Sequence, residues 1–80
     1  MNIVIERLKV RADQTVVNLR RVIPYSTAER MTIGKGAIGE STLAIYALVY
    51  AGCDHNRQLP DGRMVWESSF DSTTVFLEAE

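Results

Sequence analysis

Groups that bind metals or act as nucleophiles gather in one short segment, Cys53-Asp54-His55, with Asp61 shortly after it. Thiolate, imidazole and carboxylate groups are zinc ligands, and a thiol beside an imidazole can act as a nucleophile and its base. Two good ligands at C-x-H spacing do not complete a tetrahedral site, and the thiol–imidazole pair lacks an orienting third group. We therefore expect no metal site, cofactor or catalytic residue, with Cys53 buried as a small apolar residue and His55 in a surface loop.

A glycine-rich segment, Gly34-Lys35-Gly36-Ala37-Ile38-Gly39, has the form G-x-G-x-x-G before an apolar run. Backbone amides and a lysine at the start of a helix can hold a phosphate. A dinucleotide site also requires a βαβ unit, for which the chain has little room, and the lysine is not placed as in a P-loop. The segment is therefore expected to be a flexible loop between two helices, with phosphate binding as the alternative.

The order of segments around these glycines is similar to that of a known family. A strand ending in Val22-Ile23-Pro24, a short helix, the G-x-x-G of residues 36–39, a second helix and a strand resemble the centre of a KH domain. In that family the G-x-x-G loop clamps the backbone of single-stranded nucleic acid. The resemblance implies that Lys35, Gly36 and Gly39 would bind nucleic acid.

Charge is distributed unevenly along the chain. Residues 1–36 hold seven basic and three acidic residues, a net charge of +4, and residues 37–80 hold two basic and seven acidic residues, a net charge of −5. Such asymmetry can steer a charged partner toward one end of the molecule.

Two strand-like runs, residues 2–10 and 15–24, predict an antiparallel hairpin that carries most of the positive charge. Pairing residues whose numbers add to 27, with a two-residue turn at Asp13-Gln14, gives two consistent faces. This register sets Arg7 directly opposite Arg20. Like charges at this distance disfavour the sheet unless they are solvated or face an acidic partner. We therefore expect a basic sheet face that could bind a partner, made of Arg7, Lys9, Arg11 and Arg20, with Lys35 nearby in the sequence.

The main element that must position these residues is a helix predicted by the longest apolar run of the chain. Apolar side chains at steps of three and four predict a helix over about residues 40–51, with Ser41 or Glu40 capping its start and Gly52 ending it. A strand over residues 42–51 is the alternative, because several of its residues favour strands. The S-x-x-E pattern of Ser26 to Glu29 predicts a capping box and a short helix near 27–32.

Residues 63–68 and 73–79 predict a second hairpin, in which the numbers of paired residues add to 141. Each hairpin has an apolar face that can pack on a helix. The expected fold is an α+β domain in which the two hairpins, 2–10/15–24 and 63–68/73–79, pack on a central helix at 40–51.

Length and composition fit one small domain over residues 1–80. The net charge of −1 indicates neither a nucleic-acid partner nor a membrane partner. A single cysteine excludes an internal disulfide. Charges at the N-terminus interrupt any signal-peptide core, and no apolar run is long enough to span a bilayer. We expect a cytoplasmic protein with no membrane partner, and its small size makes a homodimer a reasonable expectation.

These observations favour a small non-enzymatic regulator or inhibitor that binds a protein partner through the basic face. Compact domains of this kind are often encoded by phages or mobile elements. The alternative is a nucleic-acid-binding module that uses the same face or the glycine loop.

Overall fold

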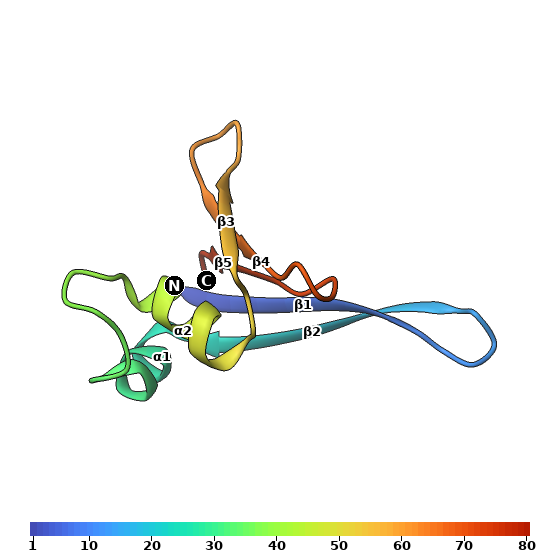
Figure 1. Cartoon of the computed structure of the whole chain (residues 1–80), viewed down its shortest axis with the longest axis horizontal. Helices are drawn as coiled ribbons and strands as arrows, with labels where there is room; N and C mark the ends of the chain where they lie inside the picture. The colour runs from blue at the N-terminus through green and yellow to red at the C-terminus, as the bar shows by residue number, and fades with distance from the viewer.

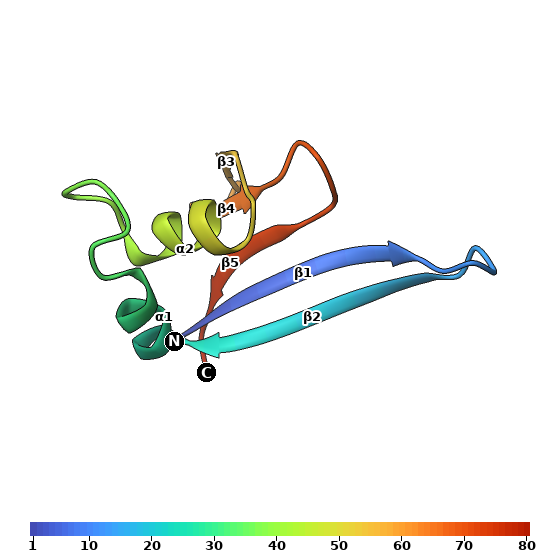
Figure 2. The ribbon, with the colours of Figure 1, turned by 60° about the horizontal axis from the view of Figure 1, so that its bottom comes forward.

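The computed structural model describes residues 1–80 as a five-stranded antiparallel sheet with two helices on one of its faces (Figures 1 and 2). The α+β class expected from the sequence is confirmed. The elements in chain order are β1 (Asn2–Val10), β2 (Val16–Pro24), α1 (Tyr25–Thr32), α2 (Thr42–Tyr50), β3 (His55–Gln58), β4 (Met64–Glu67) and β5 (Thr74–Glu78).

The two expected hairpins belong to one sheet, whose strand order is β2-β1-β5-β4-β3. The β1–β5 pairing joins them, with Ile3 opposite Leu77 and Ile5 opposite Val75. The expectation of two hairpins packed on a central helix is therefore only partly right, because both helices cover a single continuous sheet. Strand β3 was not expected, and its first residue, His55, was placed in a surface loop, since the four exposed residues of this strand carry no apolar alternation.

The expected register of the first hairpin is wrong by one residue. The numbers of paired residues in β1 and β2 add to 26, so Ile3 lies opposite Ile23 and Arg7 opposite Leu19. The turn explains this shift, because the Arg11 N–H donates to the Thr15 carbonyl at 2.9 Å and encloses a loop of three residues. Its third residue, Gln14, has a φ of 65°, as in the common three-residue loop that ends with a left-handed residue.

The expected register of the second hairpin is confirmed. Val65 lies opposite Phe76, Trp66 opposite Val75 and Glu67 opposite Thr74, so the paired numbers add to 141. Here the apolar residues themselves define the register, because a shift of one residue would exchange the two faces.

The main helix is α2, as expected, and both of its predicted end signals are present. The Ala44 N–H donates to the Ser41 side chain at 3.1 Å, and Gly52 follows the helix with a φ of 72°. The expected capping box of the first helix is wrong. Helix α1 begins two residues before Thr27, at Tyr25, its N-cap is Pro24, and no side chain caps it.

The core lies between the two helices and the sheet. Ile3, Ala28, Ala47 and Val75 are completely buried there, and Tyr46 stacks on Tyr50 with a ring separation of 5.4 Å. Because this core is small, the folded state depends on few side chains. Neither helix is long and apolar enough to cross a membrane.

The β1–β2 hairpin extends far beyond the core (Figures 1 and 2). Beyond Glu6, strand β1 pairs with no strand other than β2. The projection makes the molecule 44 Å long and gives a radius of gyration of 13.2 Å, against about 12 Å for a compact chain of this length. We call residues 7–21 the arm.

Gln14 should destabilise the tip of the arm, because a side chain in the left-handed region costs about 1–2 kcal/mol. Gln14→Gly is expected to stabilise the arm by about 0.5–1 kcal/mol, after the entropy cost of glycine is subtracted. Slower amide hydrogen exchange in the arm would show this gain. The control is Ala12→Gly, at a position without a positive φ, which should make exchange faster. Faster exchange in the Gln14→Gly variant would contradict the turn geometry.

Candidate functional site

The two faces of the arm carry different side chains. In the observed register paired residues have the same parity, so odd-numbered side chains share one face and even-numbered side chains the other. The odd face continues into the core through Ile3 and Ile23, and it is the face that the helices cover. Away from the core, each face of the arm lies open to solvent.

The odd face of the arm is basic, and we call it the basic face. None of its cations forms an ion pair within 4.0 Å. An electrostatic interaction links Arg7 with the Asp71 carboxylate. The cations of the basic face are Arg7, Lys9, Arg11 and Arg21.

The expected basic cluster therefore needs correction. Three of its arm residues, Arg7, Lys9 and Arg11, share a face as expected. Arg20 lies on the opposite face, where its guanidinium forms an ion pair with Glu78 at 2.6 Å. The wrong register caused this error. In the observed register Arg21, and not Arg20, lies on the basic face. Lys35 lies in the α1–α2 loop, at the end of the molecule away from the tip of the arm (Figure 1).

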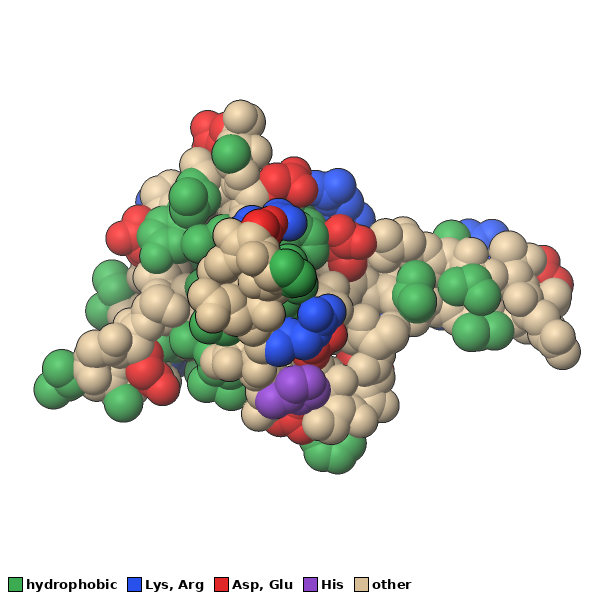
Figure 3. All heavy atoms as spheres, turned by 90° about the horizontal axis from the view of Figure 1, so that it is seen from above, with side chains coloured by type: hydrophobic (Ala, Val, Ile, Leu, Met, Phe, Trp, Pro, Cys, Tyr) green, Lys and Arg blue, Asp and Glu red, His purple; other side chains and the backbone are tan.

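The even face of the arm exposes aliphatic side chains, and we call it the apolar face. Leu8, Val10 and Val16 are 55%, 65% and 59% exposed, and Val22, the residue directly after the arm, continues this face and is 45% exposed. Figure 3 shows hydrophobic side chains along the projecting arm. Nothing in the chain covers them. The remaining polar groups are paired, as Asn18 donates to Glu6 at 2.7 Å. Exposed aliphatic side chains on two neighbouring strands are typical of a protein-binding surface.

A groove runs along the root of the basic face. Its volume is about 510 Å³, and its lining on the arm consists of Arg7, Leu19 and Arg21 together with the paired Arg20. Tyr50 and Ala51, at the end of α2, lie on its other side. The Tyr50 hydroxyl donates to the Met31 carbonyl at 2.8 Å, which fixes the ring at this position. The groove therefore combines two unpaired guanidinium groups with apolar surface, as a site for an acidic protein segment requires.

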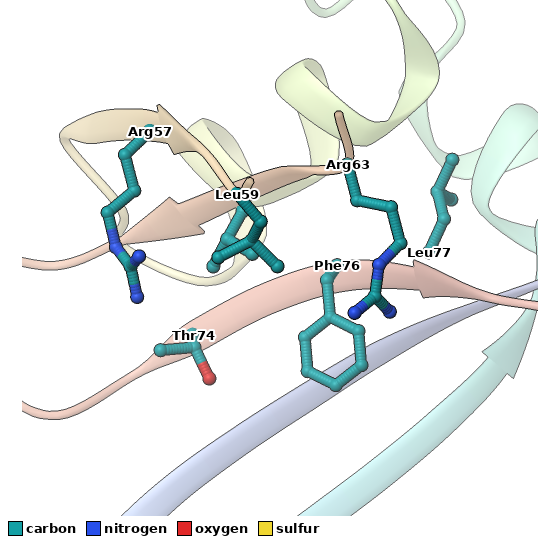
Figure 4. A pocket seen from close by; sticks show the side chains of 7 residues that line it. Arg57, Leu59, Arg63, Thr74, Phe76 and Leu77 are labelled. Carbon is teal, nitrogen blue, oxygen red and sulfur yellow. The ribbon is translucent and has the colours of Figure 1, made fainter. Parts of the chain in front are cut away.

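A second hollow, of about 250 Å³, lies between the β3–β4 turn and β5 (Figure 4). Leu59, Arg63 and Phe76 point toward it. Its basic side chains are already paired, because Arg57 donates to Glu67 at 2.7 Å and Arg63 to Asp61 at 2.6 Å. The hollow is smaller than most ligand sites and offers no free charge to a ligand.

The glycine loop does not offer a free anion site. The strand, helix, loop, helix and strand order behind the KH resemblance is present as β2, α1, residues 33–41, α2 and β3. However, the Ala37 N–H, beside Gly36, donates to the Glu40 carboxylate at 2.8 Å. A carboxylate at this amide would repel a phosphate. This arrangement disfavours the nucleic-acid role considered for Lys35, Gly36 and Gly39.

Gly36 has a packing role instead. A β-carbon at this position would lie 2.5 Å from Cγ1 of Ile45 and 2.6 Å from Oε2 of Glu40. Gly36→Ala should therefore destabilise the protein by about 1–3 kcal/mol through overpacking. Lys35→Ala, in the same exposed loop, should change stability by less than about 0.5 kcal/mol. Thermal unfolding of the two variants tests this difference, and equal unfolding temperatures would contradict the packing role.

The two candidate reactive groups of the segment Cys53-Asp54-His55 lie in different environments. Cys53 is buried, as expected, and burial together with Asp71, Asp54 and Glu67 raises the pKa of its thiol to about 11. His55 is exposed, as expected, but it begins β3 and does not lie in a loop. No group of three His, Cys, Asp or Glu side chains is placed to hold a metal ion.

Ser69 lies near His55 and Asp54, but the three do not form a catalytic triad. The Ser69 hydroxyl is 3.4 Å from His55 Nδ1, and an Asp54 carboxylate oxygen is 2.7 Å from the same nitrogen. A triad requires the hydroxyl and the carboxylate on different ring nitrogens. The cluster instead fixes the start of β3, since the Ser69 N–H also donates to Asp54 at 3.0 Å.

Exposed aspartates stabilise the turns of the protein. Asp13 and Asp61 accept hydrogen bonds from backbone N–H groups two residues on, which lowers the pKa of each carboxyl below its usual 3.8. Side-chain hydrogen bonds from Thr73 and His55 are the main causes of the lowered pKa values of Asp71 and Asp54.

These carboxylates should make stability depend on acid pH. Each folded-state pKa is lower than the unfolded value, so the stabilisation is complete above the unfolded pKa and is lost as pH falls through the folded one. The unfolding temperature should stay constant from pH 7 to about pH 5 and then decrease. The unfolding temperature of the Asp71→Asn variant should decrease less steeply as pH falls, because asparagine does not titrate. An unfolding temperature that stays constant to about pH 2 would contradict these assignments.

Comparison with models of protein families, with curated proteins and with solved structures gives no match.

Proposed function

We propose that the protein is a small non-enzymatic regulator or inhibitor that acts by binding a protein partner through its arm. The supporting observation is the uncovered arm itself, with unpaired cations on one face and exposed aliphatic side chains on the other. These four exposed cations form no ion pair within 4.0 Å, so they are available to an acidic surface. Occupying a partner's surface requires no catalytic residue.

The charge distribution favours a protein partner over nucleic acid. The arm holds five basic residues and one acidic residue, a charge of +4. Because the net charge of the whole chain is −1, the residues outside the arm carry a charge of −5. Nucleic acid is a long polyanion, and the acidic body would repel the phosphates that extend past the arm. The apolar face also offers little to phosphates, whereas it can be buried in a protein interface.

Capture from a nuclease-treated lysate of the source organism tests this proposal. The immobilised protein should retain a specific protein after nuclease treatment, and it should not shift single- or double-stranded nucleic acid at physiological salt. A steeply salt-dependent shift with both kinds of nucleic acid, and no retained protein, would instead support the nucleic-acid-binding alternative.

A further inference from the structure

The backbone groups of β2 alternate between β1 and the open edge of the sheet. The Arg11–Thr15 hydrogen bond marks an odd-numbered pair, and bonded pairs recur at every second residue of an antiparallel ladder. The even residues of β1 face the other way, as Leu8 shows: its N–H donates to the Ser72 hydroxyl at 2.9 Å, and its carbonyl accepts from that hydroxyl at 3.1 Å. In β2, the residues that direct their backbone groups to the open edge are therefore Val16, Asn18, Arg20 and Val22.

This edge is long and uncovered. Strand β2 is an edge strand with nine residues, of which all except Val17 and Ile23 are exposed. The opposite edge strand, β3, has four residues. Native proteins usually shorten or cover such edges, because an open one pairs with other chains. Pro24, which lacks an N–H, ends the edge near the helices.

The two faces beside the edge differ in chemistry. On the basic face, Arg21 lies on β2, and Arg7 and Lys9 lie one strand behind it, about 10 Å from a strand added to the edge. On the apolar face, the edge presents Val16 and Val22. Asn18 and Arg20 lie between them on this face, and both are already engaged within the chain, Asn18 with Glu6 and Arg20 with Glu78. Successive side chains of an added strand would point to these two faces in turn. Acidic side chains fit the first face and aliphatic side chains the second.

We propose that the β2 edge binds an extended segment in which acidic and apolar residues alternate, and that this segment belongs to the partner under the proposed function, on which this inference rests. Backbone hydrogen bonds would provide affinity, and the two faces would select the alternating sequence. A second copy of β2 fits less well, because it would bring a second positively charged arm beside the first.

The probe is an acetylated and amidated nine-residue peptide in which Glu and Val alternate, added to the ¹⁵N-labelled protein. One control peptide replaces each Glu with Lys, and another keeps the composition but groups the residues in blocks. The alternating peptide should slow amide exchange at least about tenfold at the outward-facing residues of β2. Exchange at Val17, Leu19 and Arg21, which already bond to β1, should change little, and both control peptides should leave the edge unprotected.

A pair of variants isolates the backbone contribution. Asn18→Pro removes one outward N–H from an exposed edge, where proline is tolerated, whereas Asn18→Ala removes the same side chain and keeps the N–H. Peptide affinity should decrease about tenfold or more for Asn18→Pro and less than about threefold for Asn18→Ala.

Equal affinity of these two variants, protection of the odd-numbered amides, or no binding of the alternating peptide would overturn the edge inference. The proposed function would still stand if the protein captured from the lysate bound Asn18→Pro as tightly as the unmodified chain. Protection that appears without peptide and increases with protein concentration would assign the edge to a second copy and overturn the inferred partner chemistry.

Discussion

Ile3→Ala is expected to unfold the protein at a much lower temperature. Ile3 is completely buried between Ile23 on β2 and Leu77 on β5, on the face that the helices cover. Truncation of a buried isoleucine to alanine costs about 2–5 kcal/mol, and each kcal/mol lowers the unfolding temperature of a domain of this size by about 4–8 °C. Thermal unfolding followed by circular dichroism should therefore show a decrease of at least about 8 °C.

Val10→Ala provides the matched control, because it also truncates an aliphatic residue of β1. Val10 lies in the arm and is mostly exposed. Its truncation should change stability by less than about 0.5 kcal/mol. A similar loss from both variants would show that the arm contributes to the core, contrary to the fold described above.

The double variant Arg7→Glu/Arg21→Glu is expected to abolish partner binding and leave the fold intact. Both guanidinium groups line the groove at the root of the arm, and neither forms an ion pair within the chain. Reversal of their charge places like charges against an acidic partner, which costs several kcal/mol and should weaken binding by at least about 100-fold. The unfolding temperature should change by less than about 4 °C, since both side chains are exposed.

The control for this double variant reverses two cations outside the arm, Arg30→Glu/Lys35→Glu. It changes the net charge by the same amount, so any effect of overall charge appears equally in both proteins. Biolayer interferometry with the captured partner should give an affinity within about threefold of the unmodified protein for the control. Equal losses in both proteins would mean that net charge, and not the arm, governs binding.

The sequence predicted the elements whose signals are local. Ser41 and Gly52 are strong signals for the ends of α2, and the apolar pattern of β4 and β5 predicted their register correctly. Strand β3 could not be predicted, because its residues are all exposed and it is held by pairing with β4. The β1–β5 pairing joins segments about 70 residues apart, for which no local pattern exists.

The site was predicted only in part because its geometry depends on one turn. Gln14 adopts a left-handed conformation that a non-glycine residue rarely takes, so the three-residue loop was not anticipated. The extra residue in the loop shifts the register by one, and this shift places Arg21, and not Arg20, on the basic face. The apolar face expected for this hairpin was assigned to the core. The wrong register placed Val10 and Val16 on different faces, whereas the structure places them on one face that no helix covers.

Shortening of the arm tests the central claim most directly. Replacing residues 8–18 with Asn-Gly joins the paired residues Arg7 and Leu19 through a two-residue turn and removes most of the arm. Because the core is elsewhere, the unfolding temperature should change by less than about 4 °C. Binding to the captured partner should weaken by at least about tenfold, because Lys9, Arg11 and most of the apolar face are removed while Arg7 and Arg21 remain. A folded, shortened protein that binds this partner with unchanged affinity would contradict the assignment of binding to the arm.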